Sequence, residues 1–421
     1  MRELENIAVE RRYDLDWLRV AAFGLLILYH IGMLYVERWG YHYKSAYLSS
    51  QLESLMLLVN PWRMALLWMV SGVATAYLLR KLKWHQFAVS RTVRLLLPLA
   101  FGLWVIVPPQ LFVEMTANGD FSGSYLAFYR AFLDLNSPLF KDYTAGIWPH
   151  VDVNHLWYLR ELWRFTLLLL VLYPLLAWLQ RSAIVAKVLV PLRDVAIVLV
   201  LPLLMVTAEV LGALPALGSD GDDRRIALGL VFFLLGYLIT FQPVIWKAFK
   251  SVRRLSLCMA VGTYVLYVIG YHQVWLTGAP ISTSMGLALT VLDHANRWFW
   301  LCALFGFAYQ YLNRPHPWLD YLSPGVYTFY LVHQTIILLT AFCLAQFSLG
   351  PLIEPLSVIT ITYAACLGIY ELVRRIQVLR PLFGLKWQTS SEIVNDREWL
   401  TVGRAVLTAL IVIPLGLEIL L

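Results

Sequence analysis

The sequence predicts an all-α, polytopic membrane protein with about 10–11 transmembrane helices and a cytoplasmic N-terminus. Hydrophobic residue types make up 60% of the 421 residues, and only 14% are charged. A soluble domain is usually about 45–50% apolar and about 25% charged, so the soluble and disordered classes are excluded. Strand-like alternation of apolar and polar residues is absent from the sequence, which argues against a transmembrane barrel.

Apolar stretches long enough to cross a bilayer recur along the chain. A hydrocarbon core of about 30 Å requires about 20 apolar residues per helix. The linker that we expect at residues 387–399 is cytoplasmic; it separates a transmembrane domain (residues 1–386) from an extra C-terminal helix (residues 400–421). The expected spans are 16–36, 54–79, 94–113, 156–179, 195–213, 226–243, 255–276, 285–311, 325–347, 355–373 and 400–421.

The basic residues indicate the orientation of these helices. The formal net charge is +7, but Lys and Arg occur in short clusters between the apolar stretches rather than in one block. With the N-terminus in the cytoplasm, the cytoplasmic segments hold 23 of the 33 Lys and Arg residues. This asymmetry is typical of membrane proteins. We therefore expect the lipid bilayer as a partner, and no nucleic acid.

The connections and the cysteines give less information about the fold and its chemistry. The long connection at residues 114–155 is expected to form a partly folded cap on the outer side. The four cysteines stand singly in apolar stretches without a Cys/His cluster, so we expect buried thiols, no disulfide and no metal site. Homo-oligomerisation is possible and is not decided by the sequence.

Ionisable residues in the first span require an explanation, because each costs roughly 2.5–3.5 kcal/mol at membrane depth. Arg19 and His30 are eleven residues apart, which places them on one helical face about 16 Å apart. Asp16 lies one turn before Arg19 and is expected to pair with it. The alternative is an arginine that snorkels to the interface and a histidine that bonds to a neighbouring helix.

Two arginines end the basic cytoplasmic loop that follows the second span. The i, i+3 spacing of Arg91 and Arg94 predicts two guanidinium groups on one side of a helix start. There they could hold a phosphate together with the helix N-terminus. The alternative is the ordinary excess of positive charge on the cytoplasmic side.

Further polar positions interrupt the other spans. Arg63 lies near the outer end of the second span, and Ser71 precedes Gly72 at a polar position suited to close helix packing. His155, Trp157 and Glu161 open the fourth span, where the alternative to a substrate role is an interfacial anchor.

The ninth and tenth spans also contain polar or ionisable residues. Tyr330 and His333 place a second histidine within the membrane, although such a residue is often only a packing histidine. Glu371 lies near the end of the tenth span, where an intrahelical ion pair is the simpler interpretation.

Several of these positions, taken in chain order, resemble the motifs of the membrane acyltransferase 3 family: Arg19 with His30, Ser71-Gly72, Arg91-x-x-Arg94, His155-Leu-Trp157 and Tyr330-Leu-Val-His333. Others resemble its glucan biosynthesis protein C branch, which succinylates osmoregulated periplasmic glucans: Pro61-Trp-Arg-Met64, Tyr370-Glu371 and Arg380-Pro-Leu-Phe-Gly384. The resemblance covers the chain from about Tyr13 to Lys386. Two features depart from it: the stretch 400–421 exceeds the family's ten-helix plan, and Arg160-Glu161 replaces residues that are apolar in that branch.

The resemblance implies a multi-pass enzyme of a bacterial inner membrane that transfers acyl groups other than aminoacyl groups. Its donor would be cytoplasmic acyl-CoA (succinyl-CoA or acetyl-CoA) as a substrate, with no permanently bound cofactor. Its acceptor would be a periplasmic glucan or another exported glycan. The donor would contact Arg91, Arg94 and Ser71. The expected substrate contacts are Arg63, His155, Trp157, Glu161, Tyr330, His333 and Glu371.

In this interpretation the catalytic residues are His30, Arg19 and Asp16. A hydroxyl is a poor nucleophile and needs a base such as histidine, so His30 would act as the general base or would itself carry the acyl group. Arg19 would orient the donor and Asp16 would hold Arg19. Two other classes remain open from the sequence: a transporter or exporter lined by buried charges, and a catalytically inert subunit.

Overall fold

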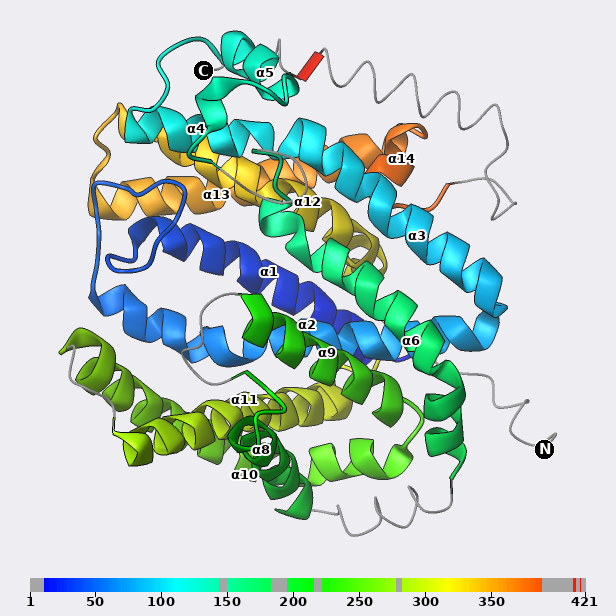
Figure 1. Cartoon of the computed structure of the whole chain (residues 1–421). Helices are drawn as coiled ribbons and strands as arrows, with labels where there is room; N and C mark the ends of the chain where they lie inside the picture. The colour runs from blue at the N-terminus through cyan, green and yellow to red at the C-terminus, as the bar shows by residue number, and fades with distance from the viewer. Residues whose placement is uncertain are drawn as a thin grey trace. The chain divides into compact units, whose positions relative to one another are not determined.

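The computed structural model describes residues 11–143, 150–182, 195–215, 222–277, 282–387, 412–413 and 417. Helices dominate these residues, which also include an isolated β-bridge between Val36 and Ser49 (Figure 1). Within the described residues, seven segments are long and apolar enough to cross a membrane: Tyr13–Tyr35, Gln51–Lys81, Trp84–Asn118, Asn154–Leu179, Pro243–Val274, Pro317–Ala345 and Gly350–Arg375. The all-α, polytopic class is therefore confirmed.

Each span expected between residues 16 and 373 contains a helix. The expected linker 387–399 and all but three residues of the expected span 400–421 lie outside the described residues, apart from Trp387. The principal helices are α1 (Tyr13–Tyr35), α2 (Gln51–Lys81), α3 (Trp84–Phe101), α4 (Pro108–Asn118), α5 (Tyr125–Leu133), α6 (Trp157–Arg181), α8 (Val195–Val210), α9 (Asp222–Ile239), α10 (Pro243–Tyr271), α11 (Thr283–Tyr311), α12 (Pro317–Ala345), α13 (Gly350–Arg375) and α14 (Leu379–Leu382).

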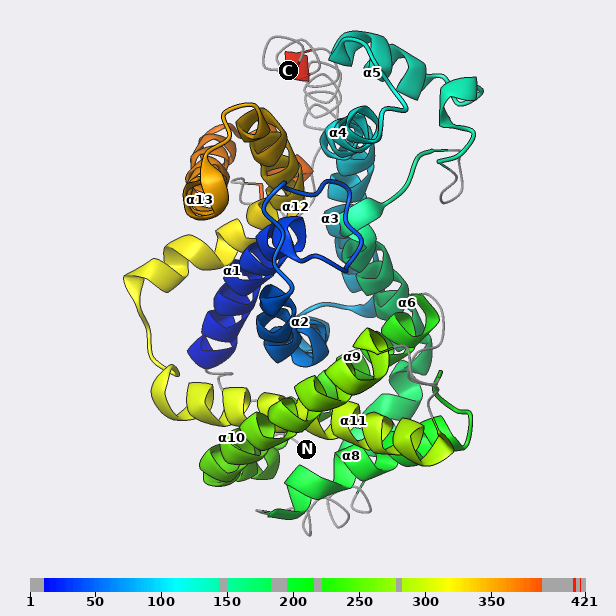
Figure 2. The same ribbon diagram turned by 90° about the vertical axis from the view of Figure 1, so that its left-hand side faces the viewer.

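The chain divides into two compact units. The first unit comprises Met1–Ala22, Leu57–Lys81 and Leu172–Ser323, and the second comprises Phe23–Met56, Leu82–Val171 and Pro324–Leu421. Within the first unit, α10 packs along α11, and both contact α8 (Figure 2). Within the second unit, the short helix α14 contacts α3 and α13, and α5 contacts α4.

Proline shapes the long span that contains α3 and α4. A π-helical turn, Gly102–Ile106, joins the two helices, and Pro108 begins α4. Proline has no N–H, so the carbonyl of Trp104 loses its usual helical donor. The Tyr129 hydroxyl of α5 donates to that carbonyl instead, at 2.7 Å. The connection at residues 114–155 is thus partly folded, as expected, and its helix α5 satisfies a backbone group that proline leaves open.

The first unit depends on glycine at a helix crossing. A Cβ on Gly72 of α2 would collide with the Phe233 carbonyl of α9, and a Cβ on Gly236 of α9 would collide with the Met69 carbonyl of α2. The two backbones are therefore in direct contact. The close packing expected at Ser71-Gly72 is found at Gly72, and its partner is Gly236.

The loop at residues 36–50 folds back on the end of α1 in the second unit. The Ser45 and Ser49 amides donate to the carbonyls of Leu34 and Tyr35, at 3.1 and 2.8 Å. The Lys44 ammonium donates to the Met33 carbonyl at 2.8 Å. These donors satisfy the last carbonyls of the helix, which have no partner within it.

The cysteines correct one expectation. All four are free thiols, and Cys302 and Cys366 are buried as expected, but Cys258 is exposed on α10. Apolar neighbours did not predict its burial because the face of a membrane helix that meets lipid is as apolar as the face that meets protein. Leu255, Val261 and Val265 of the same helix are exposed as well.

Gly236→Ala is expected to destabilise the protein by about 1–3 kcal/mol, because the added methyl group must push α2 and α9 apart. Gly262→Ala on α10 is the matched control, since a Cβ there meets no atom within 4 Å. Thermal unfolding of the detergent-solubilised variants measures the difference. Equal unfolding temperatures for the two variants would contradict the contact between the backbones.

Candidate functional site

Two histidines from different helices meet in the second unit. The Nε2 atom of His333 on α12 lies 2.9 Å from Nδ1 of His30 on α1. On its other side, Nδ1 of His333 lies 2.7 Å from the Tyr330 carbonyl and 3.2 Å from the Phe329 carbonyl. A carbonyl can only accept, so Nδ1 of His333 carries the hydrogen.

This contact determines which nitrogen of His30 carries a proton. With the hydrogen of neutral His333 on Nδ1, its Nε2 atom accepts, and Nδ1–H of His30 must be the donor. The lone pair of neutral His30 is then on Nε2. The backbone of α12 thus selects, through His333, the tautomer of His30 in which Nε2 can accept a proton.

His155 is a structural neighbour of this pair. The amide nitrogen of Gln110 donates to its Nδ1 atom at 3.2 Å, and its Nε2–H donates to the Leu331 carbonyl at 2.9 Å. The Tyr330 hydroxyl donates to the carbonyl of His155 at 2.5 Å. Both ring nitrogens of His155 are therefore engaged. Of the predicted substrate contacts, His155 and Tyr330 lie beside His333, and the rings of His155 and His333 are 5.3 Å apart.

Side-chain amides extend the polar contacts from this pair toward the loop after α1. The Thr335 hydroxyl donates to the Ile106 carbonyl, so its oxygen accepts from the Gln110 amide at 2.7 Å. The carbonyl oxygen of Gln110 must then accept from the Gln334 amide at 3.2 Å. That amide also donates to Asn154 Oδ1 at 3.1 Å. In this series of hydrogen bonds, the donor or acceptor role of each group is fixed by the bond before it.

The chain of amides ends on a histidine–carboxylate pair, His42 with Glu114. Asn154 Oδ1 accepts, so Nε2 of His42 at 3.1 Å must carry a hydrogen. The Nδ1 atom of His42 lies 2.5 Å from a carboxylate oxygen of Glu114 on α4. None of these partners was predicted from the sequence. Their only signal was position: Gln334 directly follows His333, and Asn154 directly precedes His155.

Arg91 and Arg94 lie on α3, and one expectation about them was wrong. The helix begins at Trp84, so the two arginines lie about two turns inside it rather than at its start. The N-terminus of α3 therefore cannot share a ligand with them. Arg94 Nε donates to the Gly384 carbonyl at 3.2 Å, and the Tyr327 hydroxyl donates to the Arg94 carbonyl at 3.0 Å. The Nε atom of Arg91 is buried without a hydrogen-bond partner among the described residues.

Asp16 and Arg19 form the expected pair in the first unit. Their closest nitrogen and oxygen atoms are 3.3 Å apart, and Arg11 Nε also contacts Asp16, at 3.0 Å. Arg19 also donates to the hydroxyl of Ser323. Arg19 is therefore held from two sides, by α1 and by the last residue of the first unit.

Arg63 and Ser71 both lie on α2 within the first unit. Arg63 lies twelve residues after Gln51, about 18 Å along a helix of about 45 Å, so it is deeper than the outer end where we expected it. Its guanidinium donates to Asn60 Oδ1 at 3.1 Å. The carbonyl of Ser71 accepts from the Thr75 hydroxyl at 2.8 Å.

The remaining predicted acidic residues are engaged with arginines. Buried Glu161 contacts Arg160 at 2.7 Å and Arg164 at 2.9 Å. Glu371 contacts Arg374 and Arg375, each at 3.0 Å, which is the intrahelical pairing weighed from the sequence. Trp157 packs edge-on against Tyr158.

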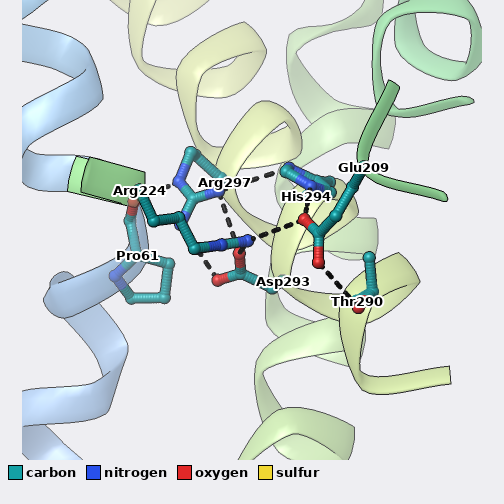
Figure 3. A network of polar contacts seen from close by, with 7 residues as sticks. All are labelled: Pro61, Glu209, Arg224, Thr290, Asp293, His294 and Arg297. Carbon is teal, nitrogen blue, oxygen red and sulfur yellow. Dashed lines mark hydrogen bonds and ion pairs between the residues drawn. The ribbon is translucent and has the colours of Figure 1, made fainter. Parts of the chain in front are cut away.

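A buried network of charged residues lies in the first unit (Figure 3). Arg224 of α9 contacts Asp293 of α11 at 2.8 Å and Glu209 of α8 at 3.1 Å. Arg297 contacts Asp293 at 3.0 Å and donates to the Pro61 carbonyl of α2 at 2.7 Å. The two guanidinium groups balance the two carboxylates, as buried charges require.

A histidine completes this network. His294 Nε2–H donates to Glu209 Oε2 at 2.8 Å, while the Thr290 hydroxyl donates to Glu209 Oε1 at 3.2 Å. The network thus ties α8, α9, α11 and α2 together. This network was not predicted from the sequence. Its one signal was that Asp293 and Arg297 stand at i, i+4 within an expected span, a spacing typical of an intrahelical ion pair.

The described residues contain no group of three or more His, Cys, Asp or Glu residues placed to hold a metal ion. A family model described as an acyltransferase domain matches residues 12–371 of the chain. Comparison with curated proteins and with solved structures gave no match.

Arg297→Met is expected to destabilise the protein by about 3–5 kcal/mol, because it leaves the buried Asp293 carboxylate with one guanidinium instead of two. Arg375→Met on α13 is the control, since it breaks an exposed pair worth at most about 1 kcal/mol. Thermal unfolding in detergent distinguishes them. If both variants unfold at the wild-type temperature, the buried network does not hold the four helices together.

Proposed function

Because this chain belongs to the acyltransferase 3 family of membrane acyltransferases, we propose that it moves an acyl group from cytoplasmic acyl-CoA to a hydroxyl of an exported glycan. The observation that carries the proposal is the contact between His30 and His333. It supplies a histidine at membrane depth whose Nε2 lone pair is selected by the backbone of α12. A proton acceptor of this kind is what a hydroxyl acceptor needs.

The reaction then has two steps. The acceptor hydroxyl loses its proton to Nε2 of His30 while its oxygen attacks the thioester carbonyl carbon. The tetrahedral intermediate collapses, the carbon–sulfur bond breaks, and the proton on His30 passes to the leaving CoA thiolate. The alternative is attack by Nε2 of His30 itself, which would give an acyl-histidine that the acceptor then cleaves. Mass spectrometry of the protein after mixing with acyl-CoA alone distinguishes the two routes.

Arg91 and Arg94 are the proposed donor contacts in the second unit. A CoA thioester carries several phosphate groups, and guanidinium groups bind phosphate with charge-assisted hydrogen bonds. The buried Nε atom of Arg91 without a described partner supports this role. Along α12, Tyr327, which contacts Arg94, precedes His333 by six residues, or about 9 Å. The pantetheine arm of the donor would span this distance.

For three residues of the first unit, the proposal rests on the resemblance of the sequence alone. Arg19, which pairs with Asp16, is expected to orient the donor, and Ser71 is expected to contact it. Arg63 would pair with the carboxylate of a succinyl group, which is the acyl group that we favour, although acetyl would need no such partner. The proposed acceptor is a periplasmic glucan, and the proposed location is a bacterial inner membrane.

His30→Ala is expected to lower kcat for acyl transfer by about 10²–10⁴-fold, because the general base is lost. His316→Ala, at an exposed histidine before α12, is the control and is expected to be active. The readout is release of CoA thiol by purified protein, with the mass of glycans from cells that express each variant. CoA release by neither wild type nor control, or equal release by His30→Ala, would reject acyl transfer through His30 and favour a transporter.

Arg91→Gln is expected to raise the KM for acyl-CoA by about 10–100-fold, since a charge-assisted phosphate contact contributes about 1.5–3 kcal/mol. The KM for the matching acyl-pantetheine, which lacks the nucleotide phosphates, should not change. Arg375→Gln, at an exposed cytoplasmic arginine, is the control. An equal effect on both donors would show that Arg91 acts on folding or chemistry and does not bind phosphate.

A further inference from the structure

The loop at residues 36–50 places an unused aromatic residue beside the proposed base. The ring of Tyr41 stacks on the ring of His30, with the centroids 6.5 Å apart and the planes 11° from parallel. The proposed proton transfer makes no use of Tyr41.

The hydroxyl of Tyr41 is buried, and it has no hydrogen-bond partner among the described residues. Such a group is unusual, because a buried hydroxyl normally finds a partner when the chain folds. Orphaned polar groups in native proteins often serve a ligand. Burial also raises the pKa of the Tyr41 hydroxyl above its ordinary value, so the group stays protonated and remains a donor.

The neighbours of Tyr41 are held firmly although its hydroxyl is not. His42 is fixed between Glu114 at 2.5 Å and Asn154 at 3.1 Å. On the other side, before Tyr41 in the chain, the backbone amide of Arg38 donates to the Glu53 carboxylate at 3.1 Å. The amides of Gln334 and Gln110 in turn orient Asn154. A position that is anchored on both sides, with an open donor between the anchors, suits a preorganised catalytic dipole.

We propose that Tyr41 is a further catalytic residue, whose hydroxyl donates a hydrogen bond to the thioester carbonyl oxygen as that oxygen becomes negative. The inference rests on the proposed acyl transfer. When the acceptor oxygen attacks the carbonyl carbon, the electron pair of the C=O bond moves to the oxygen, and the Tyr41 hydroxyl stabilises the charge without giving up its proton. When the C=O bond re-forms, the C–S bond breaks, and the thiolate takes the proton that His30 received.

The test is Tyr41→Phe, which removes only the hydroxyl and keeps the ring on His30. Loss of one donor to an oxyanion is expected to lower kcat for transfer by about 100–1,000-fold, with the KM for acyl-CoA unchanged. The unfolding temperature should be equal to or above that of the wild type, because the hydroxyl has no described partner to lose. Tyr43→Phe is the matched control in the same loop, where the ring packs edge-on against Phe342.

The outcomes separate this inference from the proposed function. If wild type transfers acyl groups, His30→Ala does not, and Tyr41→Phe keeps its kcat within about threefold, the role of Tyr41 is rejected and acyl transfer stands. A lower kcat together with a lower unfolding temperature also rejects it, because the hydroxyl then acts in folding. If wild type does not transfer acyl groups at all, the proposed function fails and the role of Tyr41 fails with it. Partial recovery of kcat by Tyr41→His, which restores a donor, would support the inference further.

Discussion

Hydrocarbon offers no hydrogen-bond partner, so each polar group that this chain places at membrane depth must find one within the protein. The carbonyl that Pro108 leaves open is satisfied by Tyr129. The charges of Arg224, Arg297, Asp293 and Glu209 neutralise one another in one buried network. In both cases helices are held together because separating them would leave a polar group unpaired.

The same need for hydrogen-bond partners determines which histidine is left able to accept a proton. His155 uses both ring nitrogens in the fold, as a donor to Leu331 and an acceptor from Gln110. His333 uses Nδ1 on the backbone and Nε2 on His30, which leaves the proton-accepting nitrogen of the dyad on His30. Three histidines near one another thus have different roles, and the hydrogen bonds that each makes decide which of them can do chemistry.

The candidate site was predictable only in part, and the reason differs from residue to residue. His30 and His333 were identified because an imidazole within an apolar stretch is costly, and such a cost is visible in the sequence. Their contact was not predictable, since 303 positions separate them along the chain. Glu114, His42 and Asn154 fall in segments that the sequence predicts to be connections, where polar residues are ordinary and carry no signal. Glu161 and Glu371 gave the same signal as the histidines, yet each is neutralised by arginines of its own helix.

The sequence by itself determined the helical class and the presence of a helix in each expected span between residues 16 and 373, because the length of an apolar run is set by the thickness of the bilayer. Of the described helices, α8, α9 and α11 are not among the seven segments that are long and apolar enough to cross a membrane. It also determined the family, through residues whose order along the chain is fixed. Only the tertiary structure decided which faces meet: Gly72 against Gly236, Cys258 on an exposed face, and His30 against His333. The physical reason is that lipid-facing and protein-facing sides of a membrane helix are equally apolar, so helix pairing depends on shape and on buried hydrogen bonds rather than on hydropathy.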